Sequence, residues 1–300
     1  RTLLAKPKSI VILSHTNPDG DAVGSSLAWA EILRNEGHEV TCILPNRYPY
    51  YLDFMPNIDS VVIFKNDDKG AAREALKRAD IIFCLDLHLL SRLDQLGDII
   101  DENQTAKRVL IDHHPDPNED FDLMFSHPEA SSTCYLVVRI IEQLYGVENI
   151  SRNMAENLFV GMMTDTGAFS YNSNSPNTYN TIARLLQKGI NKDKIYRNVY
   201  WVFSQNRMRL WGHILQNFKV SDDGHASYFT ISKSDMKKYN FIKGDAEGLV
   251  NMPLQIRGMK LSISLREDTE KPNLVWVSLR SVDNFPCNKM AAEYFNGGGH

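Results

Sequence analysis

The N-terminal part of the chain alternates short, almost wholly apolar runs with segments of helical composition. Short runs rich in Val, Ile and Leu are typical of strands buried on both faces of a sheet. The predicted strands are Ser9–Ser14, Glu39–Leu44, Val61–Phe64, Asp80–Leu85 and Arg108–Ile111. Because the segments Asp21–Glu36 and Lys69–Arg78 between them are helical in composition, the pattern predicts an α/β domain, a parallel sheet with helices on both faces.

The pattern changes further along the chain. Residues 131–188 are helical in composition, and residues 191–218 predict a charged and aromatic connecting helix. The segments that follow alternate apolar and polar residues with the period of two typical of strands, and these segments are Ala226–Ile231, Lys260–Leu265 and Leu274–Leu279. We therefore expect a second, smaller α+β domain with a mixed sheet. The expected division is one domain over residues 1–190, a linker over 191–205 and a second domain over 206–300.

Composition excludes several classes of protein. The formal net charge is -4, so the chain lacks the basic surplus of proteins that coat long duplex nucleic acid, and any nucleotide partner is expected to be small. No apolar stretch is long enough to span a membrane, and the first residues lack the apolar core of a signal peptide. Four cysteines without CxxC pairing indicate reduced thiols, and we expect a cytoplasmic protein.

Histidine and aspartate cluster directly after the first predicted strand. His15, Asp19 and Asp21 lie where that strand ends, and in an open α/β sheet the carboxyl ends of the strands form the ligand crevice. Gly20 allows a tight turn between the two carboxylates. The same residues are also typical of an Asx-type turn that caps the next helix. Taken alone, the segment leaves a ligand site and a helix cap both open.

Similar residues stand at the ends of other elements. Two further predicted strands end on Asp86 and on the triplet Asp112-His113-His114, and Asp165 closes an apolar helix. Each of these alone is also typical of a solvated strand exit or a helix-terminal turn. Their repetition favours a single polar site along one edge of the sheet.

Together these residues resemble the DHH phosphoesterases, a family named for the triplet seen here, and the resemblance extends over most of the chain. The matching motifs are His15-x-x-x-Asp19-x-Asp21, Asp86, Asp112-His113-His114, Asp165-Thr166-Gly167, Ser278-Leu279-Arg280-Ser281 and Gly297-Gly298-Gly299-His300. The resemblance implies a DHH catalytic domain followed by a DHH-associated substrate-binding domain. Members of the family normally continue past the last motif, so we expect a further tail after His300.

The resemblance also implies a role for each motif residue. His15 and Asp19 would bind one divalent cation, while Asp21, His113 and Asp165 would bind a second, and Asp86 would bridge the two. Oxygen donors with two imidazoles suit Mn²⁺, with Mg²⁺, Co²⁺ or Fe²⁺ as alternatives. The catalytic residues would be Asp86, His113 and His114. His114 would contact phosphate, or else support the metal ligands by hydrogen bonding. The substrate-binding residues would be His114, Arg280, Gly298, Gly299 and His300.

The reaction implied is hydrolysis of a phosphate ester of a short nucleotide by a water held between two metal ions. Short RNA, 3'-phosphoadenosine 5'-phosphate and cyclic-di-AMP or its linear product pApA are all open as substrates. The alternatives are an exopolyphosphatase or pyrophosphatase acting on anhydrides, and a catalytically silent sensor that binds a nucleotide. We expect a homodimer, the common default for a soluble enzyme.

Overall fold

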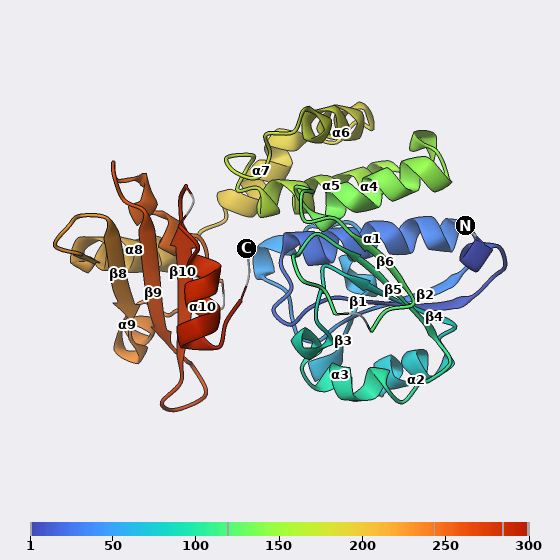
Figure 1. Cartoon of the computed structure of the whole chain (residues 1–300), viewed down its shortest axis with the longest axis horizontal. Helices are drawn as coiled ribbons and strands as arrows, with labels where there is room; N and C mark the ends of the chain where they lie inside the picture. The colour runs from blue at the N-terminus through green and yellow to red at the C-terminus, as the bar shows by residue number, and fades with distance from the viewer. Residues whose placement is uncertain (1, 119, 243, 284, 299–300) are drawn as a thin grey trace. The chain divides into compact units, whose positions relative to one another are not determined.

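A computed structural model of the chain describes residues 2–118, 120–242, 244–283 and 285–298. The chain divides into two compact units, of which the first ends at Val199 and the second begins at Tyr200. Each unit has its own sheet (Figure 1). The connecting helix predicted over residues 191–218 is instead two helices, α7 (Lys192–Tyr200) and α8 (Gln205–Asn217). They are separate because Ser204 caps α8, its side chain accepting a hydrogen bond from the Arg207 N–H.

The first unit is built on six parallel strands in the order β3-β2-β1-β4-β5-β6. The strands are β1 (Ser9–Leu13), β2 (Glu39–Leu44), β3 (Val62–Ile63), β4 (Ile81–Leu85), β5 (Lys107–Asp112) and β6 (Leu123–Ser126). The α/β class predicted from the sequence is confirmed. The edge strand β6 was not predicted, because Leu123 and Phe125 are exposed there and no buried apolar run marks it.

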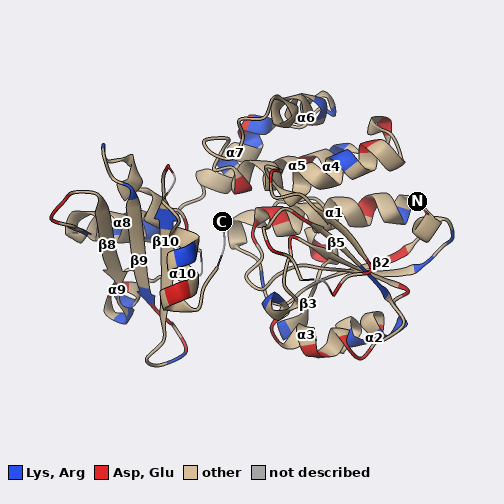
Figure 2. Ribbon diagram, in the orientation of Figure 1, with Lys and Arg blue, Asp and Glu red and all other residues tan. Residues whose placement is uncertain are grey.

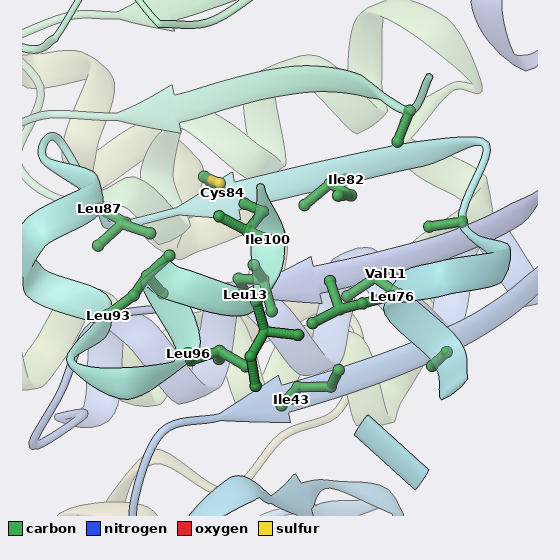
Figure 3. Packing of buried hydrophobic residues seen from close by; sticks show 14 of the residues in the cluster. Val11, Leu13, Ile43, Leu76, Ile82, Cys84, Leu87, Leu93, Leu96 and Ile100 are labelled. Carbon is green, nitrogen blue, oxygen red and sulfur yellow. The ribbon is translucent and has the colours of Figure 1, made fainter. Parts of the chain in front are cut away.

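Helices cover both faces of this sheet (Figure 1). On one face lie α2 (Ala71–Arg78) and α3 (Gln95–Ile100), and on the other lie α1 (Gly20–Asn35), α4 (Thr133–Leu144) and α5 (Arg152–Asp165), while α6 (Pro176–Gln187) packs on α5. Figure 3 shows the apolar core under α2 and α3. Its labelled members are Val11, Leu13, Ile43, Leu76, Ile82, Cys84, Leu87, Leu93, Leu96 and Ile100, all of them buried.

The strand order reverses direction at the centre of the sheet. The chain moves from β1 outward to β2 and β3, and then returns to the other side of β1 with β4. Ligands of open α/β sheets bind where the order reverses, outside the carboxyl ends of the strands. The helix that follows β1 is buried along nearly its whole length, and Figure 2 shows charged residues only towards its two ends. The residues that follow β1 and β4 are therefore candidates for a site.

The second unit has a mixed four-stranded sheet in the order β10-β9-β8-β7, in which only β8 and β9 are parallel. Its elements are β7 (Lys219–Val220), β8 (Ala226–Ile231), α9 (Lys233–Lys238), β9 (Leu261–Glu267), β10 (Val275–Ser281) and α10 (Cys287–Phe295). One apolar cluster joins α8 to β8, and a second joins α10 to β9 and β10. Among the residues described, no helix is both long and apolar enough to cross a bilayer.

Candidate active site

The loop after β1 contributes His15 and Asp19. The Nδ1–H of His15 donates to the Thr16 carbonyl at 2.8 Å, which leaves Nε2 facing Asp86 Oδ2 at 3.4 Å. Asp19 caps α1, with Oδ1 accepting from the Asp21 N–H at 2.9 Å. The helix cap suggested by the sequence is therefore present, and Asp19 also belongs to a group with His15 and Asp86 whose ligand atoms lie within 4.8 Å of one another. The two interpretations of this segment are compatible.

Asp21 lies in the first turn of α1 and contacts the beginning of α4. Its side chain is completely buried, and its two oxygens accept hydrogen bonds from the main-chain N–H groups of Thr133 at 2.6 Å and Cys134 at 2.9 Å. These are the first residues of α4, so both the free N–H groups and the helix dipole stabilise a negative charge at this point. The first turns of α1 and α4 are thus joined through the carboxylate of Asp21.

Asp86 and His113 follow the neighbouring strands β4 and β5. Asp86 has a φ of 56°, a left-handed conformation that aspartate tolerates better than most residues. Its N–H donates to the Ile111 carbonyl at 3.1 Å, which fixes its position against β5. His113 is buried, and its Nδ1–H donates to the Ala130 carbonyl at 3.3 Å. His113 Nε2 consequently points towards carboxylates, with 3.7 Å to Asp86 Oδ1.

Asp165 is the last residue of α5, and its side chain also lies beside His113. Its Oδ2 lies 3.4 Å from His113 Nε2. The helix carrying it packs closely on α1 because Gly161 has no side chain. A Cβ at Gly161 would lie 2.9 Å from Asp21 Oδ1 and in closer collision with the sulfur of Cys134. A glycine is therefore required where α5 passes the buried carboxylate.

These contacts collect the six predicted metal-site residues into overlapping groups whose ligand atoms lie within 4.8 Å of one another. The groups are His15, Asp19 and Asp86; Asp86, His113 and His114; and Asp21, His113 and Asp165. Asp86 and His113 are each shared by two groups. Carboxylates and imidazoles distant in sequence thus converge on one buried region at the end of the sheet.

The electrostatics of the cluster favour a cation. Burial, followed by the charges of Asp86 and Asp19, raises the pKa of Asp21 well above its usual range. Burial, followed by the charges of Asp21, Asp19 and Asp86, raises the pKa of Asp165 in the same way. Burial acts to raise the pKa of Asp86 too, but hydrogen bonding to His15 and that residue's charge hold it well below normal. Divalent cations would relieve this mutual repulsion.

The donor set also has the orientation that metal binding needs. His15 and His113 each use Nδ1–H on a main-chain carbonyl and turn Nε2 to the carboxylates. Imidazoles that bind metals are usually held by such a hydrogen bond from the other ring nitrogen. Carboxylate oxygens with two imidazoles match divalent ions such as Mn²⁺ and Mg²⁺ better than a thiolate-seeking metal. The residues present therefore fit divalent cations.

Two residues near the cluster were not selected from the sequence. His88 and Arg92 follow Asp86 in the loop after β4, and both lie against His114. The Nδ1–H of His114 in turn donates to Asp112 Oδ1 at 2.9 Å. The signal available in the sequence was a histidine and an arginine within six residues of a strand-end aspartate. Nothing in the sequence showed which way their side chains face.

The predicted substrate-binding residues other than His114 belong to the second unit. Arg280 lies exposed on β10, and its Nη1–H donates to the adjacent Leu279 carbonyl at 2.9 Å. Gly298 has open space where a side chain would stand. Gly299 and His300 lie outside the described residues. The roles of these four residues stay predictions.

Carboxylates and imidazoles that converge at the carboxyl end of a parallel sheet are typical of a metal-dependent enzyme. A family model described as "DHH family, N-terminal domain" matches residues 9–162. Since the match covers more than half of the chain, the protein belongs to the DHH family.

Known proteins resemble the chain over nearly its whole length. The bifunctional oligoribonuclease and PAP phosphatase NrnA of Bacillus subtilis is 27% identical over 97% of this chain and 87% of its own length. The crystal structure of an exopolyphosphatase-related protein from Bacteroides fragilis is 43% identical, with a TM-score of 0.94 over 100% of this chain and 86% of that one. RecJ of Thermus thermophilus in complex with Mn²⁺ shares the fold at 10% identity, with a TM-score of 0.50 over 99% of this chain and 49% of that one.

Proposed function

We propose that the protein hydrolyses phosphate esters of short nucleotides, using a water activated between two divalent cations. The observation that carries the proposal is the position of Asp86. It belongs to the group with His15 and Asp19 and also to the group with His113 and His114. A carboxylate shared in this way is placed to bridge two ions, which is the arrangement of two-metal phosphoesterases.

The ligand assignment follows from the groups. His15 and Asp19 would hold one cation and Asp21, His113 and Asp165 the other, with Asp86 between them. Four carboxylates balance the charge of two divalent ions, so the loaded site would be formally neutral. We propose Mn²⁺ as the preferred ion because the donors are mainly oxygens with two imidazoles.

The bound ions would supply Lewis acidity and lower the pKa of a coordinated water. The residues of the chain perform the remaining tasks. Main-chain donors at the start of α4 hold Asp21 in place. Asp112 accepts the Nδ1–H of His114, which fixes the ring orientation and directs Nε2 away from Asp112. We propose that the ring held in this way contacts a phosphoryl oxygen, as the family resemblance implies, where hydrogen bonding would stabilise charge in the transition state.

Short nucleotides are the proposed substrate class for two reasons. The net charge of -4 does not favour long polyanions. The similar protein of Bacillus subtilis is described as an oligoribonuclease and PAP phosphatase. We further propose that Arg280, Gly298, Gly299 and His300 bind the nucleotide, and that the protein works as a homodimer. The four cysteines are all buried and free, as in proteins of a reducing compartment, which supports the proposed cytoplasmic location.

The test compares the two ends of one strand. Asp86 follows β4, while Asp80 precedes it and accepts from the Ser9 N–H at 2.9 Å. Asp86→Asn keeps the shape and tolerates the positive φ, so it removes the charge without straining the loop. We expect it to lower kcat by about 10³-fold or more on dinucleotides with Mn²⁺, the scale of losing a member of a catalytic constellation. Asp80→Asn should retain activity.

A second candidate function is cleavage of phosphate anhydrides. It is favoured by the likeness to the exopolyphosphatase-related protein, which is 43% identical. A panel of diribonucleotides, 3'-phosphoadenosine 5'-phosphate, cyclic-di-AMP, pyrophosphate and polyphosphate separates the candidates by relative kcat/KM. Faster turnover of the anhydrides would replace the ester proposal. Nucleotide binding without turnover of any substrate would point to a sensor instead.

A further inference from the structure

His88, Arg92 and His114 form a polar group beside the carboxylate cluster. Arg92 Nη1 lies 3.3 Å from His88 Nδ1 and 3.4 Å from His114 Nε2. The two imidazoles are stacked, with ring centroids 4.7 Å apart and planes 16° apart. The guanidinium thus contacts Nδ1 of His88 and Nε2 of His114, and the second of these is the nitrogen that His114 directs away from Asp112.

Main-chain hydrogen bonds hold both new residues against the loops of the site. The Thr16 N–H donates to the Arg92 carbonyl at 2.8 Å, which joins the loop of Arg92 to the loop of His15. The Asn118 N–H donates to the His88 carbonyl at 2.9 Å, which joins His88 to the segment after the DHH triplet. Arg92 itself lies in a 3-10 helix, Leu90–Leu93, whose Leu93 is completely buried. The main chain that carries His88 and Arg92 is therefore held by the loop of His15, by the segment after the DHH triplet and by the buried Leu93.

By spacing alone, this corner could be taken for a third cation site. Ligand atoms of His88, Asp112 and His114 lie within 4.8 Å of one another. A divalent ion there would stand beside the guanidinium of Arg92, and like charges a few ångströms apart repel strongly in a partly buried place. Asp112 is moreover already bonded to His114. The chemistry of the corner therefore favours an anion.

Arg92 also forms no ion pair with a carboxylate among the described residues. The ion pairs formed by the described residues leave Arg92 out, whereas His15, His113 and His114 each face Asp86. A planar guanidinium offers several N–H donors in a fork that matches two phosphate oxygens. It lies beside a cluster that would hold the attacking water. An arginine in this position has an obvious anionic partner in the substrate.

We propose that Arg92 binds the non-bridging oxygens of the phosphoryl group that is attacked, beside the contact already proposed for His114. We further propose that His88 is a positioning residue that holds the orientation of the His114 ring. This inference rests on the proposed function. During hydrolysis the water oxygen forms a bond to phosphorus and loses a proton, while the bond to the ester oxygen breaks and that oxygen gains a proton. The charge on the non-bridging oxygens is neutralised throughout by Arg92.

The test uses Arg92→Gln, which keeps much of the side-chain length, and Arg92→Lys, which keeps the charge but not the fork. The matched control is Arg73→Gln, because Arg73 lies exposed on α2 and pairs with Glu102 at 2.7 Å. Circular dichroism checks that each variant is folded. Calorimetry then measures Mn²⁺ binding and the binding of inorganic phosphate to the Mn²⁺-loaded protein, and kinetics on a diribonucleotide give kcat and KM.

For Arg92→Gln we expect unchanged Mn²⁺ affinity, phosphate affinity weaker by about tenfold or more, and kcat lower by about 10²-fold, the scale of losing one transition-state donor. Arg92→Lys should recover part of both losses, and added guanidinium should partly restore Arg92→Gln. His88→Ala should lower kcat less than Arg92→Gln does and leave Mn²⁺ affinity unchanged. Arg73→Gln should match the wild type in every measurement.

Two results would overturn the inference. One is wild-type phosphate affinity in both Arg92 variants, and the other is a parallel loss of Mn²⁺ affinity, which would make Arg92 a support of the metal ligands. These outcomes are distinct from failure of the proposed function. If the wild type hydrolyses no ester, the calorimetric comparison with inorganic phosphate still decides whether Arg92 binds a phosphoryl group.

Discussion

Two buried aspartates of the first unit and two exposed aspartates of the second unit have pKa values shifted in opposite directions. In the first unit Asp21 is completely buried and Asp165 is affected by the charges of Asp21, Asp19 and Asp86, and burial and repulsion raise the pKa of both carboxyls. In the second unit Asp223 and Asp268 lie in water and accept hydrogen bonds, which lower the pKa of each. Asp21 and Asp165 therefore carry negative charge at a cost in folding free energy, whereas Asp223 and Asp268 carry it with a gain.

This difference distinguishes the aspartates of the candidate metal site from aspartates that stabilise the fold. Carboxylates placed for stability have donors nearby and face solvent. The carboxylates of the candidate metal site lie close together although they repel one another. The fold around them therefore depends on cations that neutralise their charge. The comparison predicts that the first unit responds to divalent cations and to pH near neutrality, and that the second unit responds to neither.

The largest expected effect is stabilisation by metal. Mn²⁺ at about 100 times its Kd should raise the free energy of unfolding by about 2.7 kcal/mol, since it binds only the folded cluster. Chemical denaturation followed by circular dichroism, with and without Mn²⁺, measures the gain. Asp21→Asn should remove most of it. Asp235→Asn, in the second unit, should keep it, and equal loss in both variants would contradict the comparison.

The next largest effect is expected when one glycine in each unit is replaced by alanine. Gly161→Ala places a methyl group 2.9 Å from Asp21 Oδ1, so it should displace that carboxylate and weaken Mn²⁺ binding by about 10- to 100-fold. Gly212, inside α8, has no atom within 4 Å of its Cβ position. Gly212→Ala should therefore leave metal binding unchanged and stabilise the second unit by about 0.5–1 kcal/mol. Calorimetric titration and thermal melts measure both.

A smaller effect is expected from pH in the metal-free protein. The folded pKa of Asp21 and of Asp165 is raised above the ordinary value of 3.8, so their contribution to stability is fully present below that value and is lost as pH rises through the folded pKa. The contribution of these two carboxyls to the stability of the metal-free protein should accordingly increase as pH falls from neutrality towards 3.8. Denaturation at several pH values tests this. The Asp21→Asn, Asp165→Asn double variant should have a flatter profile.

The smallest effect lies in the second unit and has the opposite sign. Two main-chain N–H groups and the indole of Trp276 hold the pKa of Asp268 at about 2. Its contribution to stability is present above the ordinary value of 3.8 and is lost as pH falls towards about 2. Asp268→Asn should lose this acid dependence, and the Trp276 Nε1–H, which donates to Asp268 Oδ2 at 2.6 Å, should be less firmly held. Fluorescence anisotropy of the variant between pH about 4 and 2 measures the change.

Much of the first unit could be predicted because its strands are buried on both faces. The strand Glu39–Leu44 was predicted with its observed bounds, and its apolar residues Val40, Cys42, Ile43 and Leu44 are all buried. The edge strand Leu123–Ser126 was missed because its apolar run is only three residues long, and the strand is only half-buried in the structure. The predicted helix over residues 191–218 failed because helical composition outweighed Ser204, the cap at which α8 begins.

The candidate site was foreseeable in its residues but not in its contacts. His15, Asp86 and His113 stand at strand ends, a pattern that the sequence displays directly. Side-chain direction does not follow from position in the chain. The contact of Arg92 with His114, and the requirement for glycine at position 161, depend on how loops and helices pack across the sheet. They became visible only in three dimensions.

The order of the strands also fixes when the protein can capture its cations during synthesis. The cluster takes its first residue from the loop after β1 and its last, Asp165, from the end of α5. A nascent chain lacks Asp165 and the close support of Gly161 until α5 has left the ribosome, and metal sites rarely pre-exist in unfolded chains. Cation capture therefore belongs to the completed first unit, and a ribosome stalled before α5 would display a sheet without a working centre.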